Sequence, residues 1–312
     1  MKPTGIKVFA PATVANVACG FDILGFALQK PGDEIIARLT GDSKGLRITA
    51  ITGAQGKLPY EVEKNTAGVA ALRLLEHLGE TTLGIELEIH KKMPFGSGLG
   101  SSAASAVAAV VVVNELLKRP LERRALLRFA VQGEQIASGS LHADNVAPSL
   151  LGGMIFIRSN ATLDIHRVPV PRGLYAAVIY PRVEVLTKDA RNMLQPNITL
   201  RQHIEQSGNL GGLLLGLFHG NLELIKRSMQ DVIIEPQRAA LIPHFYDVQR
   251  VANEGGALGC SISGAGPSIF ALCPNSFVAE NVGLAMQSIF IKNKIKNELF
   301  ISPINQEGAI LL

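Results

Sequence analysis

Apolar residues recur along the chain at two different spacings. Over residues 85–90, Ile and Leu alternate with Glu and His, which is the two-residue period of a half-buried β-strand. Over residues 66–78, Val and Leu recur in steps of three, the spacing of one helix face, and Gly79 follows as a helix stop signal. The two patterns follow one another along the chain, so both helices and strands are expected throughout.

The same patterns divide the chain into short elements. Strands are predicted at residues 6–10, 34–39, 46–51, 85–90, 154–158, 174–180, 258–262, 268–273 and 309–312. Helices are predicted at residues 66–78, 101–117, 121–138, 199–218, 222–229, 243–254 and 277–291. Helices and strands mixed in this way are typical of an α+β fold. Because 312 residues are more than one core usually organises, we expect two domains, residues 1–155 and residues 156–312.

The composition suits a well-packed globular protein and narrows the choice of partners. The chain is 47% hydrophobic and 18% charged, with a formal net charge of +4. Only 5% of its residues are aromatic and none is Trp, so platforms for stacking bases are scarce and no nucleic-acid partner is expected. The most apolar run, residues 103–113, is shorter than the ~20 residues that cross a bilayer. We therefore expect no association with membranes.

The three cysteines, Cys19, Cys260 and Cys273, lie far apart and include no CxxC pair. Neither a disulfide framework nor a zinc site is therefore expected. The first residues lead directly into the strand at 6–10 without the apolar core of a signal peptide. Together these features predict a protein of the reducing cytoplasm.

The most informative segment chemically is residues 94–105, PFGSGLGSSAAS. Glycine backbones at three alternate positions can approach a ligand closely, and the start of the following helix adds free N–H groups and partial positive charge. The segment thus predicts a phosphate site, although a plain strand-to-helix turn explains the glycines alone equally well. It lacks the lysine of the Walker A loop and the third glycine of the dinucleotide fingerprint. A phosphate loop here belongs to a third class.

Four segments, taken together and in order, resemble the GHMP kinases. They are residues 11–22 (PATVANVACGFD), the glycine segment (similar to the family's P-x-x-x-G-L-G-S-S-A-A), residues 142–153 (HADNVAPSLLGG) and residues 261–268 (SISGAGPS). Within the family, the first and third are most similar to the homoserine kinases. The resemblance implies a two-domain GHMP kinase fold, with a ribosomal protein S5 domain 2-like N-terminal domain, a ferredoxin-like C-terminal domain and an active site between them.

The resemblance also implies a reaction. In it, ATP phosphorylates the side-chain hydroxyl of L-homoserine to give O-phospho-L-homoserine and ADP, a step towards threonine, with Mg²⁺ as cofactor and a homodimer as the assembly. Two alternatives stay open. One is a GHMP kinase acting on another small alcohol, such as mevalonate or a sugar, and the other is a catalytically silent sensor of small molecules on the same fold.

The resemblance places the nucleotide and metal on particular residues. Ser102 and Glu134 are the expected Mg²⁺ ligands, because this hard ion prefers oxygen. Asn65 could equally cap the helix at residue 66, and Glu134 could be a solvated helix residue. The expected ATP-binding residues are Asn65, Pro94, Phe95, Gly96, Ser97, Gly98, Leu99, Gly100, Ser101, Ser102, Ala103 and Ala104.

Five residues are expected to bind the amino-acid substrate. Arg191 and Arg238 match positions that hold a carboxylate, for which the planar guanidinium fork is suited. Asp22 is expected to pair with the ammonium group and Asn16 to bond the same end, with His142 also at the substrate. The alternatives are that Asp22 caps a helix beginning at residue 23 and that His142 is structural.

Asn145 and Arg191 are the expected catalytic residues. Relatives place an aspartate base in the segment that ends in Gly-Gly, and counting back from Gly152 leads to Asn145, next to Asp144. Asparagine does not usefully accept a proton. Because phosphoryl transfer asks mostly for positioning and electrostatic stabilisation, we expect Asn145 to orient the hydroxyl or the γ-phosphate, with no strong base acting.

Overall fold

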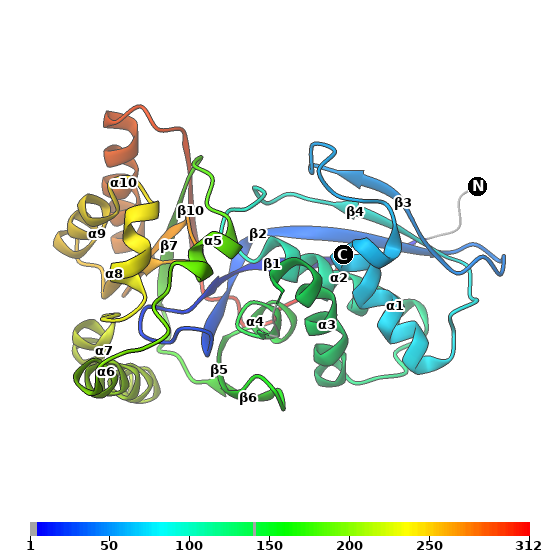
Figure 1. The fold of residues 1–312 in the computed structure, drawn as a ribbon, viewed down its shortest axis with the longest axis horizontal. Helices are drawn as coiled ribbons and strands as arrows, with labels where there is room; N and C mark the ends of the chain where they lie inside the picture. The colour runs from blue at the N-terminus through cyan, green and yellow to red at the C-terminus, as the bar shows by residue number, and fades with distance from the viewer. Residues whose placement is uncertain (1–4, 140–141) are drawn as a thin grey trace.

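A computed structural model describes residues 5–139 and 142–312 of the chain, which form two β-sheets with helices packed against each (Figure 1). The larger sheet runs in the order β11-β1-β2-β4-β3, with β5 on β2 and β6 on β5. Its strands are mostly antiparallel, and β3 and β4 are parallel. Its members are β1 (Ile6–Ala15), β2 (Leu24–Leu39), β3 (Leu46–Thr52), β4 (Ile85–His90), β5 (Met154–Ser159), β6 (Asp164–Val168) and β11 (Ile310–Leu311).

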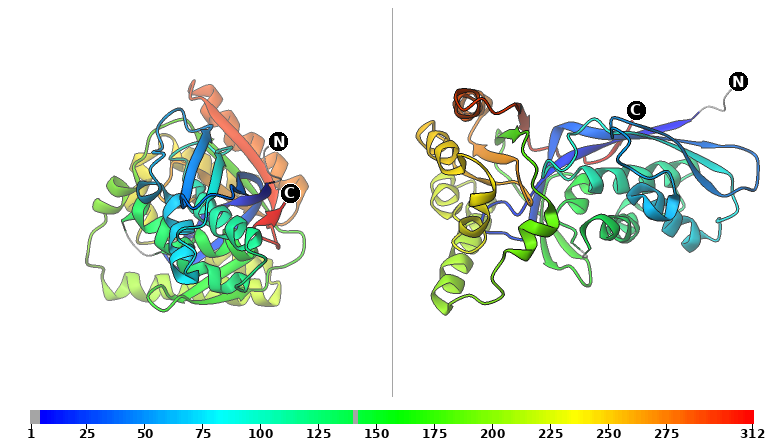
Figure 2. Two further views of the ribbon diagram at one scale, coloured as in Figure 1. Left: turned by 90° about the vertical axis from the view of Figure 1, so that its right-hand side faces the viewer. Right: turned by 45° about the horizontal axis from the view of Figure 1, so that its top comes forward.

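Four helices cover one face of this sheet (Figure 2). They are α1 (Thr66–Leu78), α2 (Ser101–Leu116), α3 (Leu127–Ser138) and α4 (Val146–Leu151). α2 lies innermost, between the strands and the other helices, so its residues from 103 to 114 are all buried. This position explains why the apolar run at residues 103–113 has no polar face.

The smaller sheet has four antiparallel strands in the order β10-β7-β9-β8. Its strands are β7 (Tyr175–Pro181), β8 (Gly259–Ile262), β9 (Ile269–Cys273) and β10 (Asn297–Pro303), and α9 (Phe245–Glu254) and α10 (Ser276–Lys292) pack against them. The remaining helices are α5 (Thr187–Asn192), α6 (Leu200–His219), α7 (Leu222–Ser228) and α8 (Glu235–Arg238). Short 3₁₀ turns occupy Val62–Lys64, Arg123–Leu126 and Ala239–Leu241. The predicted α+β class is confirmed.

The alternative that Asp22 caps a helix beginning at residue 23 is wrong, because no helix forms there. Asn16, Val17, Ala18 and Asp22 have positive φ and make a tight turn, after which Leu24 begins β2. β2 is therefore 16 residues long instead of the predicted 34–39. Its first five residues are all apolar or glycine and fully buried, so they lack the alternation that marks a strand in a sequence.

Other boundaries and elements also differ from the prediction. The helix predicted from residue 121 begins at Leu127, after a 3₁₀ turn. α4 begins at Val146, where no helix or strand was predicted, and residues 140–141 shortly before it lie outside the described part of the chain. Several elements had no predicted counterpart, namely α5, α8, β6 and β10. They are short, or lie at a sheet edge with half-buried residues, so their apolar periodicity is weak.

The division expected between residues 155 and 156 stays a prediction. The larger sheet continues past it through β5 and β6, and it also includes β11 from the far end of the sequence.

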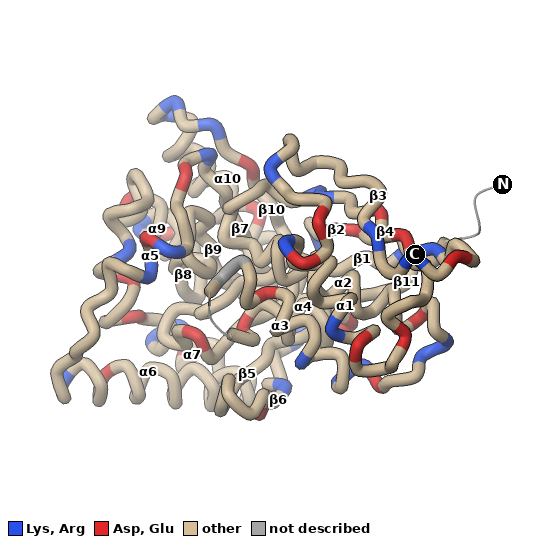
Figure 3. Tube along the Cα trace, turned by 45° about the vertical axis from the view of Figure 1, so that its right-hand side comes forward, with Lys and Arg blue, Asp and Glu red and all other residues tan. Residues whose placement is uncertain are grey.

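Basic and acidic residues interleave along the trace (Figure 3). No helix in the described ranges is long and apolar enough to cross a bilayer.

Candidate active site

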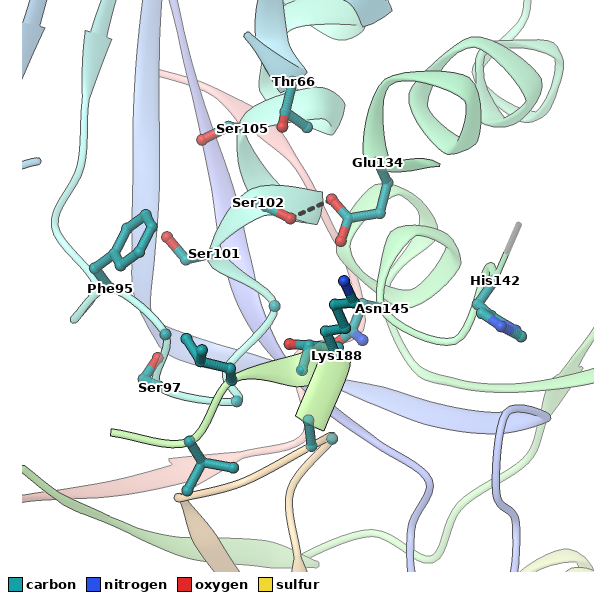
Figure 4. A pocket seen from close by; sticks show the side chains of 18 of the residues that line it. Thr66, Phe95, Ser97, Ser101, Ser102, Ser105, Glu134, His142, Asn145 and Lys188 are labelled. Atoms are coloured by element: carbon teal, nitrogen blue, oxygen red, sulfur yellow. Dashed lines mark hydrogen bonds between the residues drawn. The ribbon is translucent and has the colours of Figure 1, made fainter. Parts of the chain in front are cut away.

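A cavity of about 460 Å³ gathers residues from nearly every segment that the sequence singled out. The glycine segment and the start of α1 form one wall, and α3 and the chain before α4 form the next (Figure 4). The turn after β1, the first residues of α5 and the segment between β8 and β9 close the other end. All five expected substrate residues line it, namely Asn16, Asp22, His142, Arg191 and Arg238.

The glycines of the phosphate loop, residues 94–100, are required by both conformation and space. Gly96, Gly98 and Gly100 have φ of 64°, 75° and 66°, a region that side chains disfavour. A Cβ at Gly98 would lie 2.5 Å from the Ser263 carbonyl oxygen, and one at Gly100 would lie 2.1 Å from Thr13 Oγ1. The loop can therefore fit between its neighbours only with glycine at these two positions.

The fourth motif of the sequence, residues 261–268, supports the loop from behind. Ser263 Oγ donates to the Gly98 carbonyl oxygen at 2.8 Å, and the Ser268 backbone N–H donates to the Ser97 carbonyl oxygen at 3.2 Å. These contacts engage carbonyl groups of the loop on the side of the smaller sheet. They link the two glycine-rich motifs, which lie about 160 positions apart in the sequence, into one structure.

The expected nucleotide residues fall into two groups. Phe95, Gly96, Ser97, Gly98, Gly100, Ser101 and Ser102 line the cavity, as does Asn65. Leu99, Ala103 and Ala104 are fully buried and form the packing behind the loop, and Pro94 lines a neighbouring cavity of about 510 Å³. Asn65 also caps α1, because its Oδ1 accepts from the N–H groups of Ala67 at 3.0 Å and Gly68 at 3.4 Å. The helix-cap alternative for Asn65 is confirmed.

Ser102 and Glu134 face each other from α2 and α3, and the Ser102 hydroxyl donates a hydrogen bond to the Glu134 carboxylate (Figure 4). Burial raises the pKa of Glu134 to about 7, an effect that the Ser102 hydrogen bond opposes. A hydroxyl and a carboxylate oxygen beside a phosphate loop are the donors that a magnesium ion bridging phosphates prefers. The pair therefore fits the expected metal.

The opposite end of the cavity holds a preformed ion pair. Arg191 donates from Nη1 to Asp22 Oδ2 at 3.0 Å and from Nη2 to Asp22 Oδ1 at 2.9 Å. Asn16 fixes the turn that carries Asp22, because its Oδ1 accepts from the Asp22 N–H at 3.1 Å and its Nδ2 donates to the Gly264 carbonyl oxygen at 2.8 Å. Asn16 thus joins the first motif to the fourth.

Arg238 is held rigidly beside this pair. It is only 3% exposed, and it donates to the carbonyl oxygens of Ala190 at 2.9 Å and Gly264 at 3.2 Å. Burial and the neighbouring Arg191 lower the pKa of Arg238 to about 10, which leaves it charged at neutral pH. Phe21 packs against both guanidinium groups, with its ring centroid 5.4 Å from Arg191 Cζ and 4.9 Å from Arg238 Cζ. Two positive charges therefore share one aromatic ring.

His142 and Asn145 lie on the segment that precedes α4. His142 Nδ1 is buried 3.7 Å from Asp22 Oδ2 and has no hydrogen-bond partner within the described residues. Burial lowers the pKa of His142, which favours the neutral ring. Asn145 Oδ1 accepts from Thr13 Oγ1 at 2.7 Å, so its NH₂ group is the end that can donate to a ligand.

Sequence reasoning missed several residues of the cavity. Asp144 is buried, and burial together with Asp22 raises its pKa to about 7. Lys188 points from α5 into the cavity (Figure 4), and Lys91 lines it just after the end of β4. Phe21 does not line the cavity but packs against two arginines that do. Asp144 stands next to Asn145 and Lys188 lies three positions before Arg191, so nearness in the sequence was the available signal. Lys91 lies in no motif, and only the folded chain brings it to the site.

Comparison with known proteins agrees with this arrangement. Residues 65–153 match the family model described as GHMP kinases N terminal domain, and residues 213–292 match GHMP kinases C terminal. A homoserine kinase of Chlorobium phaeobacteroides (strain BS1) is 48% identical, over 96% of this chain and 97% of its own length. The crystal structure of homoserine kinase from Cytophaga hutchinsonii superimposes with a TM-score of 0.96 at 55% identity, covering 99% of this chain and 97% of that one.

More distant structures share the fold alone. Mevalonate kinase of L. major, solved with R-mevalonate, has a TM-score of 0.72 at 17% identity and covers 96% of each chain. The larger sheet with its glycine loop and the smaller sheet with its glycine motif are thus the two domains of the GHMP kinase fold. The chain belongs to the homoserine kinases of the GHMP kinase family.

Proposed function

We propose that this kinase transfers the γ-phosphoryl group of ATP to the side-chain hydroxyl of L-homoserine, giving O-phospho-L-homoserine and ADP in threonine biosynthesis. The observation that carries the proposal is that one cavity has two chemically different ends. One end is a phosphate loop with Ser102 and Glu134, and the other holds Asp22 with two arginines. A nucleotide and an amino acid would each find a complementary end.

The charges at the second end match a zwitterion. Arg191 and Arg238 can bind a carboxylate, and Asp22 can bind an ammonium group. A sugar has neither group, and mevalonate has a carboxylate but no ammonium group for Asp22. The chemistry of the site therefore favours an amino acid that carries a hydroxyl.

The proposed mechanism depends on positioning. Backbone N–H groups of residues 96–101 hold the ATP phosphates at the start of α2. Ser102 and Glu134 would hold a Mg²⁺ ion, which neutralises charge on the phosphates. The NH₂ group of Asn145, fixed through Thr13, orients the acceptor hydroxyl or the γ-phosphate. Arg191 holds the amino acid so that its hydroxyl faces the phosphorus, and the proton leaves to phosphate or water.

We also propose that the protein acts in the cytoplasm as a homodimer. One face of α6 supports self-association, because Leu200, Ile204, Leu215 and Phe218 are 74%, 63%, 55% and 64% exposed along it. Gly208 and Gly211 lie between them, and a Cβ at either position would meet no other atom within 4 Å. Residues 206–218 carry no charge, and the face is nearly symmetric about its glycines. A twofold interface requires a surface that complements itself in this way.

The function is tested by measuring ADP release with four acceptors, namely L-homoserine, mevalonate, galactose and none. Turnover with homoserine alone supports the proposal. Turnover with mevalonate or galactose reassigns the substrate to another small alcohol. No turnover with any acceptor, while nucleotide and homoserine still bind, makes the chain a catalytically silent sensor.

A further inference from the structure

The two ends of the phosphate loop meet at one buried side chain outside every sequence motif. Asp33 lies within β2, is fully buried and does not line the cavity. A carboxylate at such a position is stable only when hydrogen bonds replace the water that it has lost. The identity of its partners therefore shows what the carboxylate holds together.

The two oxygens of Asp33 hold the two ends of the loop separately. Oδ1 accepts from the backbone N–H groups of Lys92 at 2.8 Å and Met93 at 3.2 Å, immediately before the loop. Oδ2 accepts from Ser101 Oγ at 2.9 Å, at the first residue of α2 and immediately after the loop. One rigid carboxylate thus sets the distance between the entry and the exit of the loop.

Lys91 balances the charge of Asp33 and adds a second link. Its ammonium group donates to Asp33 Oδ2, to the Ser101 carbonyl oxygen at 2.7 Å and to Ser105 Oγ at 2.7 Å. The two side chains are 5% and 0% exposed. The pair therefore ties the end of β4 and the first turn of α2 to the centre of β2.

We propose that Asp33 is a positioning residue for the nucleotide, which orders the phosphate loop before ATP binds. The inference rests on the proposed role of this loop in holding ATP phosphates. A segment with three glycines loses much conformational freedom when it becomes ordered. Ends held at a fixed spacing leave the loop N–H groups already directed at one place, so binding loses less affinity to ordering.

The test compares the wild type with Asp33→Asn and Asp33→Glu. Asn keeps the shape and one acceptor oxygen but removes the charge, and Glu keeps the charge on a longer side chain. For Asp33→Asn we expect the KM for ATP and the Kd for Mg·ADP to rise roughly tenfold, the loss of one charge-assisted hydrogen bond. The KM for homoserine should stay within twofold, and the amides of residues 96–101 should exchange hydrogen faster. The KM for ATP and the Kd for Mg·ADP of Asp33→Glu should lie between those of the wild type and Asp33→Asn.

Arg38→Met is the matched control. Arg38 lies on the same strand, and its Nη1 is 2.7 Å from Glu88 Oε1 in a partly buried ion pair away from the cavity. Arg38→Met should lower the melting temperature without changing the KM for ATP or the KM for homoserine. The inference is overturned if Asp33→Asn lowers stability in the same way and leaves the ATP parameters within twofold, or if ATP and homoserine weaken equally. If Asp33→Asn does not fold, the same criteria apply to Asp33→Glu. A wild type that binds no nucleotide overturns the proposed function instead.

Discussion

Arg191 and Asp22, 169 positions apart in the sequence, form a two-pronged ion pair at one end of the cavity. The charges needed for a zwitterion are therefore already in place and satisfied by one another. An amino acid that enters can exchange partners with this pair, its carboxylate taking the arginine and its ammonium group taking the aspartate. Such an exchange leaves neither charge of this partly buried pair without a partner.

Replacing either arginine should weaken homoserine binding specifically. A charge-assisted hydrogen bond contributes ~1.5–3 kcal/mol, so Arg191→Ala or Arg238→Ala should raise the KM for homoserine by roughly ten- to a hundredfold. The KM for ATP should change less. Arg158→Ala removes an exposed ion pair with Asp164 and is the control. Unchanged homoserine kinetics in both site variants would rule out the carboxylate assignment.

Asp22→Asn should change selectivity between homoserine and 4-hydroxybutyrate, which lacks the ammonium group. The variant keeps the turn geometry but removes the partner of that group, so we expect homoserine to bind at least tenfold more weakly. 4-Hydroxybutyrate has no ammonium group for Asp22 to bind, so the substitution should weaken its binding less. The affinity for 4-hydroxybutyrate relative to homoserine should therefore be higher in the variant than in the wild type. Inhibition constants for both compounds check this. Equal weakening of the two would mean that Asp22 acts only by holding Arg191.

Two variants of Asn145 distinguish a role in orienting the reacting groups from a role in proton transfer. Asn145→Ala removes the amide that Thr13 fixes, and we expect a loss of kcat of roughly tenfold or more with little change in the homoserine KM. If Asn145→Asp instead raised kcat and introduced an acidic limb in the pH profile, a missing base would limit the wild type. Silent kinetics in Asn145→Ala would remove the residue from the mechanism. Pre-steady-state and steady-state rates at several pH values provide the measurement.

Glu134 should make metal binding and stability depend on pH in opposite directions. Burial raises its pKa from an ordinary 4.5 to about 7. A raised carboxyl pKa contributes stability that is fully present below pH 4.5 and is lost as the pH rises through about 7. Without metal, Glu134→Gln should therefore gain melting temperature relative to the wild type between pH 5 and pH 8.

The same carboxyl must be ionised to bind a cation. The affinity of the wild type for Mg²⁺ should consequently fall as the pH drops through about 7, and Glu134→Gln should bind Mg²⁺ weakly throughout. Calorimetric titration and thermal unfolding in metal-free buffer measure the two effects. A difference between the two proteins that does not vary with pH would contradict the raised pKa.

The α6 face is tested by placing a charge on it. Leu215→Glu puts a carboxylate within the proposed interface and should convert a dimer to monomers in light-scattering measurements. Leu284→Glu is the matched control, because Leu284 is a 60% exposed leucine on α10. A monomeric wild type, or a Leu215→Glu variant with unchanged mass, would exclude α6 as the interface.

The local motifs were predictable from the sequence because their chemistry is local. Gly96, Gly98 and Gly100 adopt a positive φ that glycine takes readily and other residues do not, and the cap of α1 at Asn65 involves only the next three residues. The first half of β2 was not predictable, since its buried run has no period. The partners of Asp33 were not predictable either, because they come from residues 91–93 and Ser101, which only the fold brings to β2.

Some residues of the site were only partly predictable from the sequence. Phe21 stands between a glycine and the predicted Asp22, yet nothing local indicates that it packs against two arginines more than 160 positions away. Ser102 and Glu134 were expected as Mg²⁺ ligands from the family resemblance. The structure brings the two side chains into a hydrogen bond, and their role as metal ligands stays a prediction.

The return of β11 to the edge of β1 has a consequence for synthesis on the ribosome. Val8 and Phe9 pair with Leu311 and Ile310, so one edge of the larger sheet stays open until some 300 further residues have been made. An open strand edge is a template for pairing with another chain. A nascent chain stalled within the smaller sheet therefore exposes β1, and chaperone occupancy should be longest over that interval.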